Sequence, residues 1–392
     1  MAVDPAPTRG TPGWRDPHRA LWPLALLVPV LPFLAYLTWR GTGAAGAWWL
    51  TPVVVFGVIP VVDLLVGDHR DNPPEEAVPA LQRDGYYRWL TYLFLPVQYA
   101  ALVLGCHLFT TADLSPLGTA GLVATLGVVN GIAINTAHEL GHKRERLERR
   151  LSKVALAPTG YGHFYVEHNR GHHTRVATPE DPASARLGES FWAFWPRTVL
   201  GSLRSAWRLE TARFRLRGRS PWTYRNDILN AWAMTVLLFA LLTVAFGPAV
   251  LPFLLLQAVA GFSLLEVVNY LEHYGLARQR TAAGRYEKVD PRHSWNSDRT
   301  VTNIFLFQLQ RHSDHHANPL RRYQALRTFD ESPQLPAGYA TMVVCALVPP
   351  LWRRVMDHRV LAHYDGDLSR ANVAPRALAR LRADFGDAGV AR

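Results

Sequence analysis

The segments NTAHELGHKRERLERR, residues 135–150, and YVEHNRGHHTRVATPEDPASAR, residues 165–186, decide how this chain is organised. Their histidines recur at short helical spacings, and a downstream segment, LQRHSDHHA, repeats the pattern. Residues three or four apart share one face of a helix, and imidazoles that converge from such a face are typical metal ligands. A lone histidine is more often structural, but three clusters favour a polyhistidine metal site. The clustered histidines are His138, His142, His168, His172, His173, His312, His315 and His316.

The apolar residues of the chain are gathered into long runs. Hydrophobic residues make up 49% of the 392 residues, and several runs reach the roughly 18 residues that span a bilayer. The net charge of +11 comes from basic residues that lie between these runs, which indicates membrane topology and not nucleic-acid binding. The two cysteines, Cys106 and Cys345, form no paired motif, which excludes an iron–sulfur module in this chain.

The predicted fold is all-α, an integral-membrane bundle of six helices. Residues 1–20 are rich in Pro, Gly and charge and predict a disordered tail. The apolar body is taken as one membrane domain over residues 21–366, followed by a C-terminal cytoplasmic tail over residues 367–392. The predicted spans are residues 21–39, 47–66, 89–109, 117–137, 228–246 and 250–270.

The distribution of Lys and Arg sets the expected orientation. The tail, the segment after the second span, the long middle segment and the C-terminal region carry basic residues, so both termini are predicted to be cytoplasmic. The fourth span leads into His138 and the sixth into His273, which places a helical cap with the histidines on the cytoplasmic side of the inner (plasma) membrane. Within the middle segment, FWAFWPRTVLGSLRSAWRLE suits either an interfacial helix or a soluble helix that covers the metal site.

One motif has a second interpretation. His138-Glu139-Leu140-Gly141-His142 fits the zinc-protease pattern H-E-x-x-H, in which Glu139 would be the general base. Such an enzyme needs one further ligand and leaves most of the clustered histidines unused. Eight histidines exceed the three or four protein ligands of one zinc ion, so two metal ions are expected. Spacing alone does not name the metal.

Further residues are candidates around this centre. His273 is the ninth candidate ligand because it ends the sixth span, whereas His163 and His293 are either structural or supporting. Carboxylates next to the histidines could orient the imidazoles through their outer nitrogens, or could be ordinary solvated charges. These candidate carboxylates are Glu139, Glu167, Glu272 and Asp314.

The motifs HELGHK, EHNRGHH, NYLEHYGL and LQRHSDHHA resemble those of the integral-membrane alkane 1-monooxygenases, which belong to the histidine-box family of membrane desaturases and hydroxylases. NPPEE at 72–76, VATPEDPASAR at 176–186 and HSWNSD at 293–298 fit as well, so that the resemblance covers most of the chain. LQRHSDHHA is specific to the alkane-hydroxylase branch.

This resemblance implies a di-iron centre, O2 as oxidant, and terminal hydroxylation of medium- to long-chain n-alkanes taken from the membrane lipid. It carries the metal-ligand role to the eight clustered histidines and His273. It also implies a separate rubredoxin as electron donor, with a rubredoxin reductase upstream, because this chain lacks the cysteines of a fused one. The chemistry of an alkane agrees with a metal-based oxidant, since an unactivated methyl group offers no proton to a base and no carbonyl to a nucleophile.

Three other functions remain open from the sequence. A fatty-acyl desaturase or an aromatic-methyl hydroxylase would use the same ligands and differ in product or substrate. A metal transporter would hold its ligands near the bilayer midplane, whereas these clusters lie outside the predicted spans.

Two surfaces follow from the predicted bundle. Val55, Ile59 and Val62 share a face of the second span, which either lines the alkane cavity or meets lipid. A basic stretch beside the first ligand pair predicts either a docking site for an acidic rubredoxin or an anchor on anionic lipid. Its residues are Lys143, Arg144, Arg146, Arg149 and Arg150.

Overall fold

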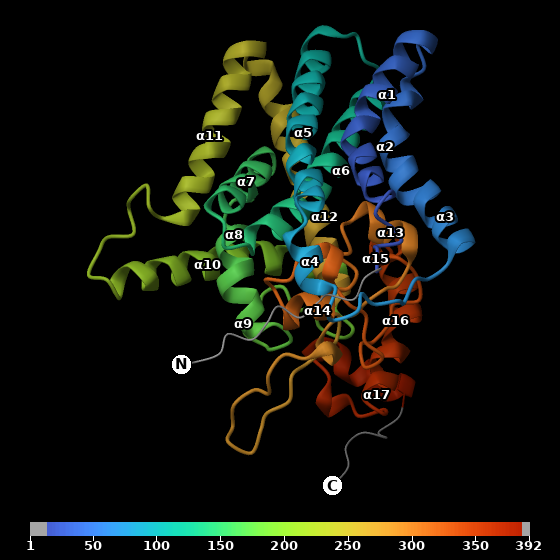
Figure 1. The fold of residues 1–392 in the computed structure, drawn as a ribbon, viewed down its shortest axis with the longest axis vertical. Helices are drawn as coiled ribbons and strands as arrows, with labels where there is room; N and C mark the ends of the chain where they lie inside the picture. The colour runs from blue at the N-terminus through green and yellow to red at the C-terminus, as the bar shows by residue number, and fades with distance from the viewer. Residues whose placement is uncertain (1–13, 386–392) are drawn as a thin grey trace, which may run out of the picture.

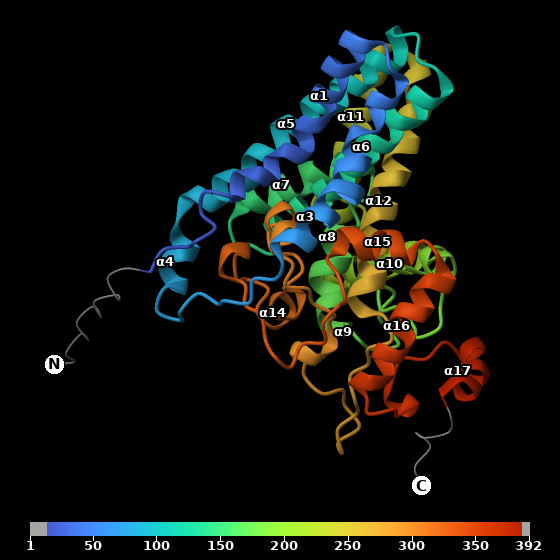
Figure 2. The same ribbon diagram turned by 90° about the vertical axis from the view of Figure 1, so that its right-hand side faces the viewer.

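The computed structural model describes residues 14–385, which contain no β-strand beyond isolated bridges. Six long apolar helical segments in this range fit a multi-pass membrane protein and stand roughly side by side (Figure 1). Short helices and loops gather at one end of the bundle (Figure 2). The six segments are Trp22–Thr42, Ala45–Val66, Gly85–Thr111, Pro116–Gly141, Asp227–Phe246 and Pro248–His273. Their main helices are α1 (Leu27–Thr42), α3 (Ile59–Val66), α5 (Gly85–Thr111), α6 (Pro116–Gly141), α11 (Asp227–Phe246) and α12 (Leu251–His273).

The six predicted spans are confirmed, but several helices extend beyond the apolar runs from which they were predicted. α5 begins at Gly85, where the side chain of Asp84 accepts a hydrogen bond from the backbone N–H of Tyr86. α6 continues through the polar residues to Gly141, and α12 continues to His273. Hydropathy ends where polar residues begin, whereas a helix ends only where its backbone is capped or broken.

The second span is not one uninterrupted α-helix. It passes through a 3-10 turn (Ala45–Trp49), α2 (Leu50–Val53), a π-helical turn (Val54–Val58) and α3. Pro60 at the start of α3 cannot donate a backbone hydrogen bond, which favours such an irregular turn just before it.

The π turn changes which residues of this span face inward. Val55, Ile59 and Asp63 are buried, whereas Val62 is only partly buried. The carboxylate of Asp63 accepts hydrogen bonds from the backbone N–H groups of Val301 and Thr302, at 2.9 and 3.0 Å. It thereby caps the first turn of α13 (Thr300–Phe305), far away in sequence.

α6 and α12 form the central pair of the bundle, and their contact depends on glycine. A Cβ on Gly127 would lie 2.5 Å from the Cβ of Ala260, and one on Gly131 would lie 2.8 Å from the carbonyl oxygen of Gly261. Small residues let two membrane helices approach closely. The close approach brings the histidine-bearing ends of both helices together.

After α6 the chain turns back along it as α7 (Arg146–Leu156). The carbonyls at the end of α7 are satisfied by side chains of the long helices: the Tyr99 hydroxyl donates to the Val154 oxygen at 2.7 Å, and the Gln98 amide donates to the Ala155 oxygen at 3.2 Å. Gln98 also donates to the side chain of Asn130 at 2.9 Å. Unpaired backbone groups are costly in an apolar bundle, so these side chains fix the position of α7.

The remaining elements lie around the histidine end of the bundle. α10 (Phe191–Arg215) runs across the bundle axis (Figure 1), and the last two helices of the described chain lie below it (Figure 2). These helices and the short elements near them are α4 (Val78–Arg83), α8 (Phe164–Val166), α9 (His173–Arg175), α14 (His312–Ala317), α15 (Tyr339–Ala346), α16 (Pro349–His363) and α17 (Leu378–Phe385).

The predicted tails differ from the structure. Residues 1–13 and 386–392 lie outside the described part, but Asp16 accepts hydrogen bonds from the indole of Trp22 and the hydroxyl of Tyr87, which tie its segment to the bundle. At the other end, Leu381 of α17 is fully buried in the core around Tyr270 and Trp352. Segments 14–20 and 367–385 therefore contact the rest of the protein, because a few apolar or hydrogen-bonded residues anchor segments that look polar on average.

Candidate metal centre

All nine histidines predicted as ligands come together at one end of the bundle. They form two adjacent groups, and within each group one ligand atom per residue lies within 4.8 Å of every other. The first group is His138, His142, His168, His173 and His315; the second is His172, His273, His312 and His316. The rings of His172 and His173, at 6.0 Å between centroids, are among those that join the groups.

The histidines do not divide between the two groups as they would on one face of a regular α-helix. His168 and His173 belong to the first group although they are five residues apart, while His172 between them belongs to the second. The cause is the π-helical turn Glu167–His172, whose i→i+5 bonding brings residues five apart to the same side. A Cβ at Gly171 would lie 2.6 Å from a carboxylate oxygen of Glu167, so the side chain of Glu167 would have to shift if this glycine were replaced.

The ring nitrogens already approach one another closely. Nε2 of His138 lies 2.8 Å from Nε2 of His315, and Nε2 of His168 lies 3.0 Å from Nε2 of His173. In the second group, Nε2 of His312 and His316 are 2.9 Å apart. Two neutral imidazoles can share one proton across such a contact, but a whole group of converging nitrogens presents more lone pairs than protons.

Burial keeps six of the nine imidazoles neutral. It lowers the pKa of the histidines outside the membrane spans well below the usual value, and neighbouring histidines lower the pKa further. A neutral imidazole offers its lone pair to a metal ion. The histidines to which this applies are His142, His168, His173, His312, His315 and His316.

Several buried polar atoms here have no hydrogen-bond partner in the described part of the chain. They include Nε2 of His142, His172 and His273, and one carboxylate oxygen of Glu272. Buried polar atoms are rarely left unpaired in proteins, and the three histidines named here belong to the two groups in which ligand atoms converge. The donor set therefore fits one metal ion in each group.

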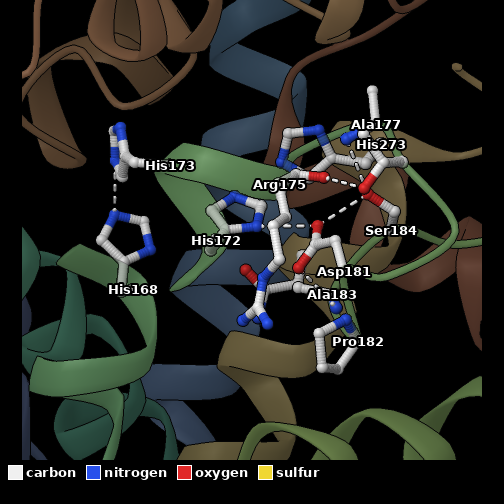
Figure 3. Close-up of polar contacts among 12 residues, drawn as sticks. His168, His172, His173, Arg175, Ala177, Asp181, Pro182, Ala183, Ser184 and His273 are labelled. Atoms are coloured by element: carbon white, nitrogen blue, oxygen red, sulfur yellow. Dashed lines mark hydrogen bonds and ion pairs between the residues drawn. The ribbon is translucent and has the colours of Figure 1, made fainter. Parts of the chain in front are cut away.

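A carboxylate that sequence reasoning missed orients one of the rings. Asp181 lies 2.9 Å from Nδ1 of His172 and accepts a hydrogen bond from the hydroxyl of Ser184 at 2.6 Å (Figure 3). Burial alone would raise the pKa of Asp181, but His172 and the Ser184 hydroxyl lower that pKa to about 2. An ionised Asp181 holds the proton of His172 on Nδ1 and leaves Nε2 free for a metal. Asp181 lies in the segment TPEDPAS, nine residues after His172, and this position in the sequence does not indicate that it orients the ring.

The four carboxylates predicted to support the histidines behave differently. Only Glu272 has a close contact to a cluster histidine, 3.2 Å from Nε2 of His312. In the described part of the chain the other three pair with basic residues instead: Glu139 with Lys143 at 3.0 Å, Glu167 with Arg175 at 2.8 Å, and Asp314 with Arg321 at 2.8 Å. Adjacency in sequence to a histidine does not fix the direction of a side chain on a helix.

The pairing of Glu139 also bears on the zinc-protease interpretation. The same carboxylate accepts a hydrogen bond from the backbone N–H of Tyr323 at 3.3 Å. It is therefore engaged away from His138 and His142 and is not placed as a general base.

His163 and His293 lie outside both groups. The ring of His163 is buried against Tyr161, with centroids 4.3 Å apart. The side chain of His293 is held by Glu287 at 3.0 Å, and its carbonyl oxygen lies 3.4 Å from Nδ1 of His273. His293 thus supports a candidate ligand through its backbone, and His163 is a packed core residue.

An apolar cavity begins at the histidine groups and extends between the long helices. His138, His168 and His312 line its end at the centre, and Val55 and Ile59 are among its apolar lining. Val62 does not line it, because the π turn rotates α3 and brings Asp63 inward. Besides the histidines, the few polar side chains that line the cavity are Asn135, Asn269, Glu272, Thr302 and Tyr339.

The predicted basic surface is partly wrong. Lys143 is buried, pairs with Glu139 and donates to the backbone oxygen of Arg321 at 2.9 Å, so it is not available at the surface. Arg146, Arg149 and Arg150 are exposed and line one open pocket. Arg144 is exposed as well but does not line that pocket.

Fold and site together define a multi-pass helical membrane protein with a buried histidine-rich metal site. Residues 115–346, which include all nine histidines, match the fatty acid desaturase family. The alkane 1-monooxygenase of Acinetobacter baylyi is 50% identical over 335 residues, 86% of this chain and 82% of that protein. The alkane 1-monooxygenase of Ectopseudomonas oleovorans is 45% identical over 362 residues, 92% of this chain and 90% of that protein. The chain therefore belongs to the alkane 1-monooxygenase family.

A more distant relative has a different substrate in its name. The xylene/toluene monooxygenase hydroxylase component of Pseudomonas putida is 26% identical over 344 residues, 86% of this chain and 89% of that protein.

Proposed function

We propose that this protein hydroxylates the terminal methyl group of medium- to long-chain n-alkanes, with O2, two iron ions and electrons from a separate rubredoxin. The observation that supports it most directly is the apolar cavity, which ends at histidines of both groups. An alkane has no polar group to bind, so only the shape of the cavity and the exclusion of water can position it.

The reaction consumes the alkane, O2, two electrons and two protons, and yields the 1-alkanol and water. Iron bound in the two groups would supply the oxidant that an unactivated C–H bond requires. The side chains of the cavity bind and position the alkane. The walls around Val55 and Ile59 keep the chain extended and dry, and the histidine end of the cavity presents one carbon to the centre.

Product analysis tests this function. Purified protein with iron, a rubredoxin system and a series of n-alkanes should give 1-alkanols that carry one oxygen atom from labelled O2. An alkene from a fatty-acyl substrate would instead identify a desaturase. Faster turnover of xylene than of any alkane would identify an aromatic-methyl hydroxylase, the activity named for the distant relative.

The ligand set is tested by substitution. Replacing His138, His172, His273 or His315 singly by alanine should lower bound iron and abolish activity, because each ring belongs to one of the two groups. Glutamine at His163, which lies outside the groups, is the control and should keep the full iron content. A His273→Ala protein that keeps two irons and full turnover would remove His273 from the ligand set.

The electron donor is expected to dock on exposed cations near the first group. Arg146, Arg149 and Arg150 have no carboxylate partner among the described residues and line one pocket. Charge reversal at Arg146 and Arg149 should raise the KM for rubredoxin and flatten its salt dependence, since complementary charge steers association. The same reversal at the exposed Arg217 and Arg219 is the control. An unchanged salt dependence would exclude this pocket.

The basic residues also support an orientation. We infer that the histidine end of the bundle and both termini face the cytoplasm across the inner membrane, because the turns at the other end carry few basic residues. Proteolysis of right-side-out and inverted vesicles tests this. Cleavage in the exposed segment 280–285 should occur only in inverted vesicles.

A further inference from the structure

An open groove lies where α10 meets the beginning of α11, away from the metal centre. Three tryptophans, Trp207, Trp222 and Trp232, line it together with Leu203 and Leu229. The rings of Trp207 and Trp222 are 5.0 Å apart between centroids, and Trp222 is 73% exposed. The groove is therefore largely apolar, and no part of residues 14–385 fills it.

The position of the groove is that of a membrane surface. α11 is a membrane-spanning helix that begins at Asp227, so that Leu229 and Trp232 lie in its first two turns. α10 runs across the bundle axis at this level (Figure 1) and presents exposed Trp192 and Leu200. Tryptophan is enriched at the boundary between lipid headgroups and acyl chains.

Two cations stand at the edge of the groove. Arg204 and Arg208 are one helical turn apart on α10, and both are exposed. The only polar contact between them joins Nε of Arg208 to the backbone oxygen of Arg204 at 3.3 Å. Neither guanidinium pairs with a carboxylate in residues 14–385, so both remain available to an anion.

We propose that this groove binds an anionic phospholipid of the surrounding bilayer, with its phosphate on Arg204 and Arg208 and an acyl chain against the three tryptophans. The combination of an apolar floor and two unpaired cations matches one molecule that carries both an acyl chain and a negative phosphate. A soluble acidic protein would satisfy the arginines but would have to displace lipid from the tryptophans.

Buried residues of α10 link this lipid to the metal centre. Glu210 of α10 accepts a hydrogen bond from Arg170 at 2.6 Å, and Ser205 accepts one from Arg175 at 2.6 Å. Both arginines belong to the segment that carries His168, His172 and His173. A lipid that fixes α10 therefore steadies the segment that supplies three candidate ligands.

The test uses the full-length protein in nanodiscs of phosphatidylcholine with increasing fractions of phosphatidylglycerol. Wild-type protein should retain phosphatidylglycerol preferentially in native mass spectrometry and should unfold at a higher temperature as its fraction rises. The double variant Arg204→Gln/Arg208→Gln should lose about 30-fold of this preference, since each cation near a lipid surface contributes on the order of 1 kcal/mol.

The matched control is Arg217→Gln/Arg219→Gln, which removes the same charge from exposed positions outside the groove. It should keep the preference of the wild type. Trp222→Ala should weaken retention of both lipids without changing the preference between them. A preference that survives in the Arg204/Arg208 variant, or that falls equally in the control, would overturn the proposal, as would the absence of any preference in the wild type.

Discussion

His172 shows at the residue scale how the protein prepares a nitrogen for a metal. Its Nδ1 faces the ionised Asp181, and its Nε2 has no hydrogen-bond partner among residues 14–385. Asp181→Asn keeps the size of the side chain but removes the negative charge. We expect metal affinity to fall about 10- to 100-fold, as is usual when a carboxylate behind a ligating histidine is lost.

Metal content after dialysis, at a series of free iron concentrations, measures this change. Glu180→Gln alters the adjacent exposed carboxylate and should leave the affinity unchanged. Equal affinity in Asp181→Asn and the wild type would show that Asp181 does not orient the ligand.

His163 makes a separate contribution to acid sensitivity. Its burial lowers its pKa to about 4, whereas an unfolded histidine titrates near 6.5. Between these values the unfolded chain binds more protons, so stability is fully present above pH 6.5 and is lost as the pH falls toward 4. The loss amounts to about 2 kcal/mol at pH 5.

His163→Gln should therefore reduce the difference in unfolding free energy between pH 7.5 and pH 5 by that amount. Denaturant unfolding in detergent at both pH values measures it. His358→Gln, at an exposed position, is the control and should keep the wild-type difference. An unaltered difference in His163→Gln would mean that another group causes the acid sensitivity.

At the element scale, the π turn of the second span determines which residues of that span line the cavity. It buries Val55 and Ile59, which line the cavity, and leaves Val61 56% exposed on the outer side. Val55→Trp should fill the far part of the cavity, because a packed space tolerates extra volume poorly. Shorter alkanes should still be oxidised, while longer ones should be lost.

Product yields across an alkane series measure this shift in chain length. Val61→Trp adds the same ring on the outer face and should keep the wild-type profile. Undiminished oxidation of long alkanes by Val55→Trp would show that the chain does not extend past Val55.

At the scale of the whole molecule, the candidate metal site brings together segments that are far apart in the sequence. The nine histidines come from the ends of α6 and α12, from residues 168–173, and from α14. A metal that binds only the folded state stabilises it by mass action. Chelation should therefore lower the thermal unfolding temperature, and ferrous iron should restore it.

Calorimetry or tryptophan fluorescence of the purified protein measures this response. In His273→Ala the second group loses one donor, and the effect of chelation should be smaller. A wild-type unfolding temperature that does not respond to chelation would argue against a structural contribution of the metal.

The sequence by itself determined the number of spans and the set of histidines. Both are local properties: a run of apolar residues long enough for a bilayer becomes a helix wherever it lies, because its backbone groups must pair internally. The short motifs around His138, His168 and His312 can likewise be recognised from their own residues, without information on the segments that surround them in the fold.

Only the tertiary structure decided how these residues are used. The division of the histidines into two groups depends on a π turn, the support of His172 comes from Asp181 across a loop, and Lys143 is withdrawn from the surface by Glu139. Each outcome depends on the exact direction of a side chain and on segments distant in sequence. Hydropathy and spacing record neither, because they describe what a residue is and not what the folded chain places beside it.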